Sequence, residues 1–191
     1  MKRLLSVLLA VVMLVFPCCI AESADTTIAA EPFRSLETYA VYHDTAMNLL
    51  DVPRYGYDAY LDTELTQIEI GEVNDAITYS IDDPDNGFVL LMMPTGTTQI
   101  NGVWAFLPHM GTDYTAPKFL LEYCASILYG SGFIDDFEKV TNVMYELNLY
   151  SPSPFAFGAS GRAVSEDGTL EATYQCSETL GIFIAINAVK Q

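Results

Sequence analysis

Phe88–Met93 (FVLLMM) is an unbroken apolar run that directly follows an acidic stretch ending in Asn86-Gly87. A run this short, placed after a turn signal, is typical of a strand and not of a helix. Because it lacks the alternation of a half-exposed strand, both of its faces must be covered or it must lie at the centre of a sheet. The sequence therefore predicts a sheet with an apolar middle, in which Ala76–Ile81 is the antiparallel partner across the turn.

Local patterns predict the other elements. Helices are expected over residues 35–50 and 116–129, and a third helix is expected to begin with Asp135 as N-cap, because Glu138 three residues later completes a capping-box pattern. A short strand or extended loop is expected at 55–62, and further strands at 65–72, 100–108, 155–164, 170–176 and 181–189. Val73–Ala76 (VNDA) is expected to form a turn between two of them.

This order of elements predicts the α+β class, as a two-layer sandwich of a mainly antiparallel sheet with about three helices. Residues 25–191 are expected to form one domain, which is a normal length for a single core. Short matches between the halves, such as GFVLLM with GIFIAI, raise the hypothesis of an internal repeat over 33–94 and 134–188. The alternative is that strands resemble one another by composition alone.

The first 24 residues have the pattern of a secretory signal peptide. Lys2 and Arg3 precede the apolar segment Leu4–Phe16, and Pro17 and small residues follow. That segment is shorter than the roughly 20 residues that span a bilayer, and no later stretch provides a transmembrane segment. The pattern predicts a secreted or extracytoplasmic protein. A lipid anchor on Cys18 or Cys19 is the alternative, but it is not expected, because Phe16 and Pro17 stand where lipoprotein signals carry small residues.

The chain is strongly acidic, with 25 acidic and 8 basic residues and a formal net charge of −17. This charge would be repelled by a phosphate backbone, so nucleic acid is not an expected partner. The hydrophobic content of 51% excludes an intrinsically disordered chain.

The acidic stretch before Gly87 does not match a calcium loop of the helix–loop–helix type. With Gly87 at position 6, Pro84 occupies position 3 and Met93 position 12, and neither has a side-chain oxygen ligand. Gly158–Arg162 (GASGR) differs from the serine nucleophile elbow, since Arg162 replaces its last glycine. No metal site and no cofactor are predicted.

The two histidines, His43 and His109, carry the enzyme alternative. His43 lies on the apolar stripe of the first helix and is expected in the core. His109 lies in a strand-to-helix loop near Asp113, a position from which catalytic residues often project. With Cys124 as a further candidate, these residues would form an extracytoplasmic hydrolase site.

Two cysteines remain after removal of the signal peptide, Cys124 and Cys176, and both fall at apolar positions. In an oxidising compartment they are a candidate disulfide. Two buried thiols are the alternative, because spacing alone does not bring them together.

A tyrosine-rich stretch is the main candidate for binding. Flat aromatic rings beside carboxylates can hold sugars or cations, and tyrosine is common in protein interfaces. The candidate binding residues are Tyr55, Tyr57, Asp58, Tyr60 and His109. The sequence therefore predicts a secreted or cell-envelope, non-enzymatic domain that recognises a protein or glycan partner through tyrosine-rich surface, with the hydrolase of His109 and Asp113 as the alternative.

Overall fold

The apolar run at residues 88–93 lies inside one antiparallel sheet in the computed structural model of the chain. The structure describes residues 32–52, 59–62, 64–70, 72–81, 87–107, 115–151, 156–178 and 181–189. Its helices are α2 (Leu36–Leu49), α3 (Thr115–Ser131) and α4 (Val140–Glu146), with a short 3-10 helix at Phe137–Lys139 before α4. Its strands are β1 (Ala59–Leu61), β2 (Thr66–Ile70), β3 (Glu72–Ile81), β4 (Phe88–Pro94), β5 (Gly102–Leu107), β6 (Ser160–Val164), β7 (Leu170–Ser177) and β8 (Gly181–Ala188).

The strands follow the order β1-β3-β4-β5-β8-β7-β6, and β2 pairs with β3 outside this row. Every pairing is antiparallel. β4 lies between β3 and β5, with five consecutive buried residues, so the position predicted for the apolar run is confirmed. The α+β class and the mainly antiparallel sheet are confirmed as well.

Helix α2 begins where its local sequence predicts. Ser35 is the N-cap, and its side chain accepts a hydrogen bond from the backbone N–H of Thr38, which satisfies one of the free donors of the first turn. The buried stripe includes His43 and Met47, and it also takes in Tyr39 and Ala46. The expectation that His43 belongs to the core is confirmed, since its side chain is fully buried.

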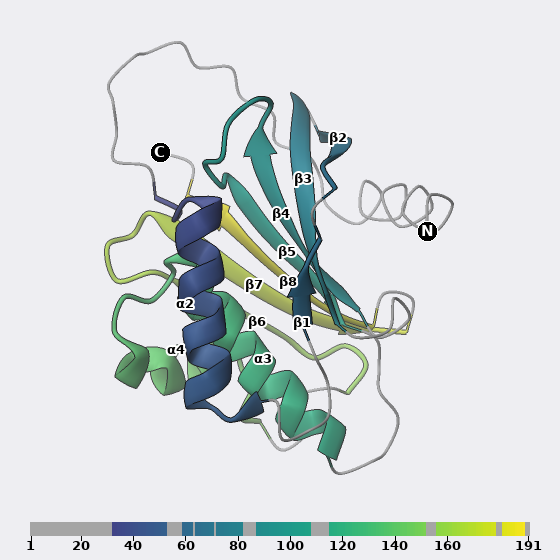
Figure 1. Cartoon of the computed structure of the whole chain (residues 1–191). Helices are drawn as coiled ribbons and strands as arrows, with labels where there is room; N and C mark the ends of the chain where they lie inside the picture. The colour runs from purple at the N-terminus through teal and green to yellow at the C-terminus, as the bar shows by residue number, and fades with distance from the viewer. Residues whose placement is uncertain are drawn as a thin grey trace. The chain divides into compact units, whose positions relative to one another are not determined.

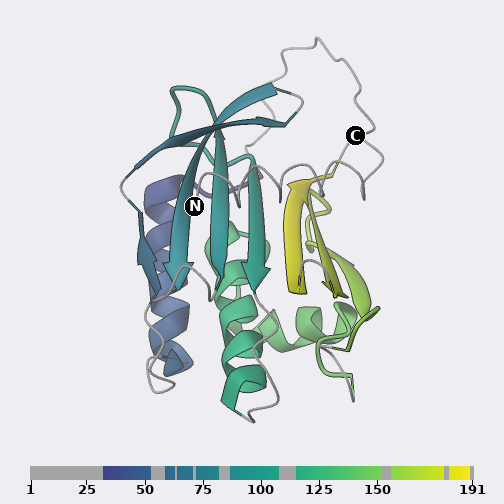
Figure 2. The ribbon, with the colours of Figure 1, turned by 90° about the vertical axis from the view of Figure 1, so that its right-hand side faces the viewer.

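Helices α2 and α3 lie beside each other against one face of the sheet (Figure 1), and in the turned view they lie behind the strands (Figure 2). The two helices approach closely at Gly130 of α3. A Cβ there would lie 3.1 Å from Tyr39 Cε2 and 3.1 Å from His43 Cβ of α2, so the missing side chain makes room for both. Alternate strand residues complete the core beneath the helices, among them Ile77, Tyr79, Val89, Leu91, Val103, Ala105, Tyr174, Cys176, Ile182 and Ile184.

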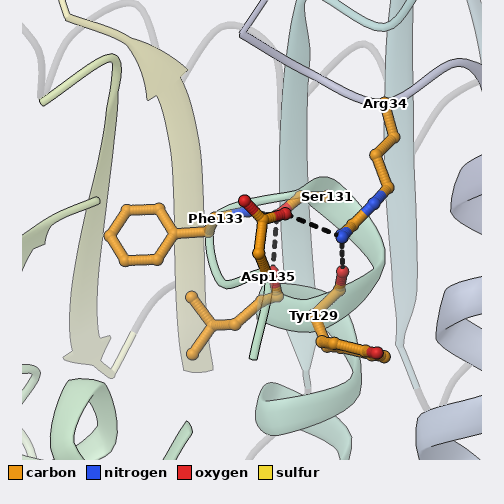
Figure 3. A network of polar contacts seen from close by, with 6 residues as sticks. Arg34, Tyr129, Ser131, Phe133 and Asp135 are labelled. Atoms are coloured by element: carbon orange, nitrogen blue, oxygen red, sulfur yellow. Dashed lines mark hydrogen bonds and ion pairs between the residues drawn. The ribbon is translucent and has the colours of Figure 1, made fainter. Parts of the chain in front are cut away.

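Arg34 joins the end of α3 to the segment that leads into α2 (Figure 3). Its guanidinium donates to the carbonyl of Tyr129, forms an ion pair with Asp135 at 3.0 Å, and lies 3.8 Å from the centre of the Tyr42 ring. The predicted N-cap at Asp135 is therefore wrong. Asp136 takes that role instead, accepting from the backbone N–H of Glu138 at 3.0 Å.

The turn predicted at Val73–Ala76 is also wrong, because these residues belong to β3. Asn74 accepts a hydrogen bond from Asn101 Nδ2, and Asp75 accepts one from the backbone N–H of Gly96. Polar residues that favour a turn locally are here used to hold the loop between β4 and β5.

The hairpin predicted on either side of the acidic stretch is confirmed by the pairing of β3 with β4, in which Ser80 is opposite Phe88. Residues 82–86 of the stretch itself lie outside the described residues, as do the predicted signal peptide and the cysteines within it. The repeat over 33–94 and 134–188 stays a prediction.

Candidate functional site

The residues predicted to bind are mostly not placed by the structure. Tyr55, Tyr57, Asp58 and His109 lie outside the described residues, as does Asp113 of the hydrolase alternative. Tyr60 is placed by its backbone alone, in the edge strand β1, where it is opposite Ser80 of β3. The structure therefore does not test whether these residues form one surface, but it does show what β1 adjoins.

Among the described residues, no helix lies over the second face of the sheet (Figure 2). We call this the helix-free face and define it by three rows of cross-strand neighbours. The rows are Ser80-Phe88-Phe106-Phe183-Gln175-Ser160, Thr78-Leu90-Trp104-Ala185-Thr173-Arg162 and Ala76-Met92-Gly102-Asn187-Glu171-Val164. The backbone of Tyr60 continues the first row beyond Ser80.

The middle of the helix-free face is aromatic. The ring centre of Phe106 lies 5.2 Å from that of Phe88 and 4.8 Å from that of Phe183, and Trp104 meets Phe183 edge to face at 6.0 Å. Contacts of this geometry stabilise aromatic pairs beyond simple area burial. Phe106 and Phe183 are no more than 6% exposed, whereas Phe88 and Trp104 are half-buried. The buried rings form a floor, and Phe88 and Trp104 are the aromatic groups that a ligand could touch.

Uncharged polar groups surround this floor on the side of β7 and β8. Asn187 is exposed and accepts a hydrogen bond from Trp104 Nε1 at 3.3 Å, while Thr173 and Gln175 are half-buried on the neighbouring strand. Two of the residues in the three rows are charged, Arg162 and Glu171, and they pair with each other. The three rows of the face therefore offer aromatic contact and hydrogen-bonding groups without net charge.

A second group of polar side chains lies in the core between α2, α3 and β3. The ring of His43 is stacked on Tyr39 at 5.5 Å, tilted against Tyr79 at 4.6 Å and edge-on to Tyr123 at 5.5 Å. Nδ1 of His43 lies 3.2 Å from Asp44 Oδ1, and Nε2 meets no hydrogen-bond partner within the described part of the chain. Burial lowers the pKa of His43, although a hydrogen bond from His43 Nδ1 to the Asp44 carboxylate acts in the opposite direction.

The neutral state of His43 gives a pH-dependent stability. Because the pKa is lowered in the folded state, the unfolded chain binds more protons once the pH falls below about 6.5, the ordinary pKa of histidine. The free energy of unfolding should therefore be constant above that pH and fall as the pH drops below it. Urea unfolding at pH 7.5, 6.5, 5.5 and 5.0 measures this.

The matched variant is His43→Phe, which keeps a ring among Tyr39, Tyr79 and Tyr123 without the proton site. It should lose most of the fall in stability between about pH 6.5 and pH 5. An equal fall in both proteins would show that another group causes the acid sensitivity.

Cys124 and Cys176 are both buried, and the structure draws no disulfide between them. Burial raises the pKa of Cys124 to about 12, so its thiolate is scarcely populated at neutral pH. The burial of Cys124 argues against this thiol as the nucleophile of the hydrolase alternative, and the alternative of His109 and Asp113 stays a prediction. The bridge between the two cysteines stays a prediction, which a count of free thiols in the denatured, unreduced protein decides.

A hollow of about 300 Å³ lies between the end of α3 and the β6–β7 turn. Its acidic groups are already engaged: Glu166 pairs with Lys139, and Asp167 accepts hydrogen bonds from Ser165 and Thr169. These bonds lower the pKa of Asp167 and hold the turn between β6 and β7. Within the described ranges, no group of three or more potential ligand side chains could hold a metal ion.

No family model, no curated protein and no solved structure matches the chain. Of the helices in the described residues, none is long and apolar enough to cross a membrane.

The helix-free face was not predicted from the sequence. Its only local signal is that the aromatic residues Trp104 and Phe106 are two positions apart in one strand, and the pairing of β5 with β8 is needed to add Phe183.

Proposed function

We propose that this protein is an extracytoplasmic, non-enzymatic binding domain that recognises its partner through the helix-free face around Trp104. The observation that carries the proposal is the aromatic centre of this face, on a side of the sheet that has no helix among the described residues. An antiparallel sheet with one solvated face normally alternates apolar and polar residues. β4 and β5 instead place Leu90, Met92, Trp104 and Phe106 on this side.

The tyrosine-rich stretch extends this proposal to the edge of the sheet. Residues 53–58 directly precede β1, and the backbone of Tyr60 continues the row that holds Phe88, Phe106 and Phe183. A partner that lies along this row would therefore reach β1. The signal-peptide pattern of residues 1–24 supports an extracytoplasmic location.

Site-specific photo-crosslinking tests the proposal. A photoreactive amino acid is placed at Gln175, on the helix-free face, and in a matched protein at Val41, which is exposed on α2. Each is exposed to a surface fraction of the source organism, and adducts are stained for protein and for carbohydrate. We expect a discrete adduct from position 175, competed by excess unlabelled protein and lost when Trp104→Ala is added. Equal adducts from both positions, or an adduct indifferent to Trp104→Ala, would contradict the proposal.

The hydrolase alternative is tested separately with ester, peptide and glycoside substrates. The binding proposal predicts no turnover above a heat-inactivated sample. Turnover that His109→Ala abolishes would replace the binding proposal with the enzyme alternative.

A further inference from the structure

We propose that the ligand of the helix-free face is a neutral carbohydrate, with Trp104 as the ring on which a sugar stacks and Asn187, Thr173 and Gln175 as hydrogen-bonding groups. The inference rests on the proposed function and deepens it by naming the chemical class of the ligand. It is carried by the fixed orientation of the half-buried Trp104, by the polar groups beside it and by the absence of net charge in the three rows.

Trp104 is held in a defined orientation near the middle of the sheet. Its indole N–H donates to Asn187 Oδ1 at 3.3 Å, and its ring meets Phe183 at 79°. On the next strand its neighbour in the row is Ala185, whose side chain is small. A ring fixed in this way loses little freedom when a ligand binds to it. The C–H face of a pyranose is an apolar surface that fits such a ring.

Hydrogen-bonding groups lie next to the indole in the same rows. Because Trp104 can only donate, Oδ1 of Asn187 is its acceptor, and the amide nitrogen of this exposed side chain is directed elsewhere. Thr173 donates to the carbonyl of Ala185 at 3.5 Å, so its hydroxyl oxygen can accept from a ligand. Gln175 adds a second amide beside Phe183. Amide and hydroxyl groups that both donate and accept match the hydroxyl groups of a sugar.

The charge of the face favours a neutral ligand. The chain has 33 acidic and basic residues in total, yet the three rows hold a single mutually neutralised pair, Arg162 and Glu171. A cationic protein would be attracted to the acidic chain as a whole but would find no free carboxylate at the centre of this face. An acidic polysaccharide would be repelled by the net charge of −17.

The apolar centre of the face offers little surface to a protein partner or a second copy. Leu90, Met92, Phe106, Phe183 and Ala185 are already 94% or more buried, so they have little surface left to bury. A stable protein interface needs about 800 Å² from each partner. Among the described residues, the half-buried rings of Phe88 and Trp104 and the polar groups beside them are the accessible part of this centre, and a sugar ring needs a smaller footprint than a protein.

The experiment uses Trp104, the only tryptophan of the chain, as its own reporter. The emission of the purified protein is followed during titration with neutral hexasaccharides of β-1,4-glucose, α-1,4-glucose, β-1,4-xylose and β-1,4-N-acetylglucosamine. A galacturonic acid hexamer and a Lys/Leu amphipathic peptide are the charged comparators. We expect a saturable change with at least one neutral sugar, with Kd between about 1 µM and 1 mM, and weaker binding of both charged probes.

Calorimetry with the binding sugar then tests the named residues. Trp104→Ala should weaken binding at least about tenfold, and Asn187→Ala, which changes an exposed side chain, should weaken it about threefold to tenfold. Tyr145→Ala is the matched control, because Tyr145 is 65% exposed on α4, away from this face, and it should bind as the unchanged protein does.

Four results would overturn the inference: no binding of any neutral sugar, unchanged affinity in both face variants, tighter binding of the cationic peptide, or a dimer in light scattering that Trp104→Ala dissociates. If the sugars fail while the face-specific adduct at position 175 persists, the carbohydrate inference is wrong and the proposed binding function stands. If neither is found, the proposed function itself is wrong.

Discussion

Replacing Gly161 by alanine is expected to cost at least about 3 kcal/mol of the free energy of unfolding. Gly161 lies in β6, where the end of α4 approaches the edge of the sheet. A Cβ at this position would lie 2.1 Å from the carbonyl oxygen of Leu147 and 2.3 Å from its carbonyl carbon. Both atoms belong to the backbone, so α4 would have to move away from β6.

Gly102→Ala is the matched control for this substitution. A Cβ at Gly102 would also be too close to a neighbour, at 2.5 Å, but that neighbour is the terminal methyl group of Met92. A methionine side chain can rotate away, so the cost should stay below about 1 kcal/mol. Thermal unfolding compares the two variants, with a fall of roughly 6–12 °C expected for Gly161→Ala. Equal melting temperatures would show that α4 does not pack on β6 as described.

Leu91→Ala should destabilise the protein by about 2–5 kcal/mol. Leu91 is fully buried near the middle of β4, where it is opposite Ile77 of β3 and Val103 of β5 on the face covered by the helices. Its loss removes apolar contacts and leaves a cavity that strands on both sides cannot readily fill. Urea unfolding measures the change as a lower midpoint with an unchanged slope.

The control is Leu49→Ala, the same substitution at a leucine that is 64% exposed at the end of α2. It should change the free energy of unfolding by no more than about 0.5 kcal/mol. If both leucines cost the same, Leu91 and the centre of the sheet do not belong to the core as described.

Sequence patterns were sufficient where the deciding contacts are local. The start of α2 was predicted at Ser35, and the alternation of Leu170–Cys176 gives the buried and half-buried sides of β7 directly. The central position of Phe88–Met93 followed from its lack of alternation. For each of these features, the residues that determine the structure lie within one short segment of the chain.

Prediction failed where a distant residue overrides the local pattern. Asp135 has the spacing of an N-cap, but Arg34, 101 positions away, engages it as an ion pair. Asn74 and Asp75 favour a turn locally, yet Asn101 and Gly96 hold them within β3. The helix-free face is the largest example, because its rows depend on the pairing of β5 with β8, about 80 residues apart in the chain.

The accessibility of Trp104 in the free protein tests the central claim most directly, because the helix-free face can bind a partner only if its indole is open to solvent. Quenching of its emission by acrylamide measures this without knowledge of the ligand, and the chain has no other tryptophan to interfere. For a half-buried side chain we predict clear quenching in the native protein, weaker than in the urea-unfolded chain and reduced further by a bound ligand. Native emission that acrylamide does not quench until the chain unfolds would contradict the assignment of this face as the binding surface.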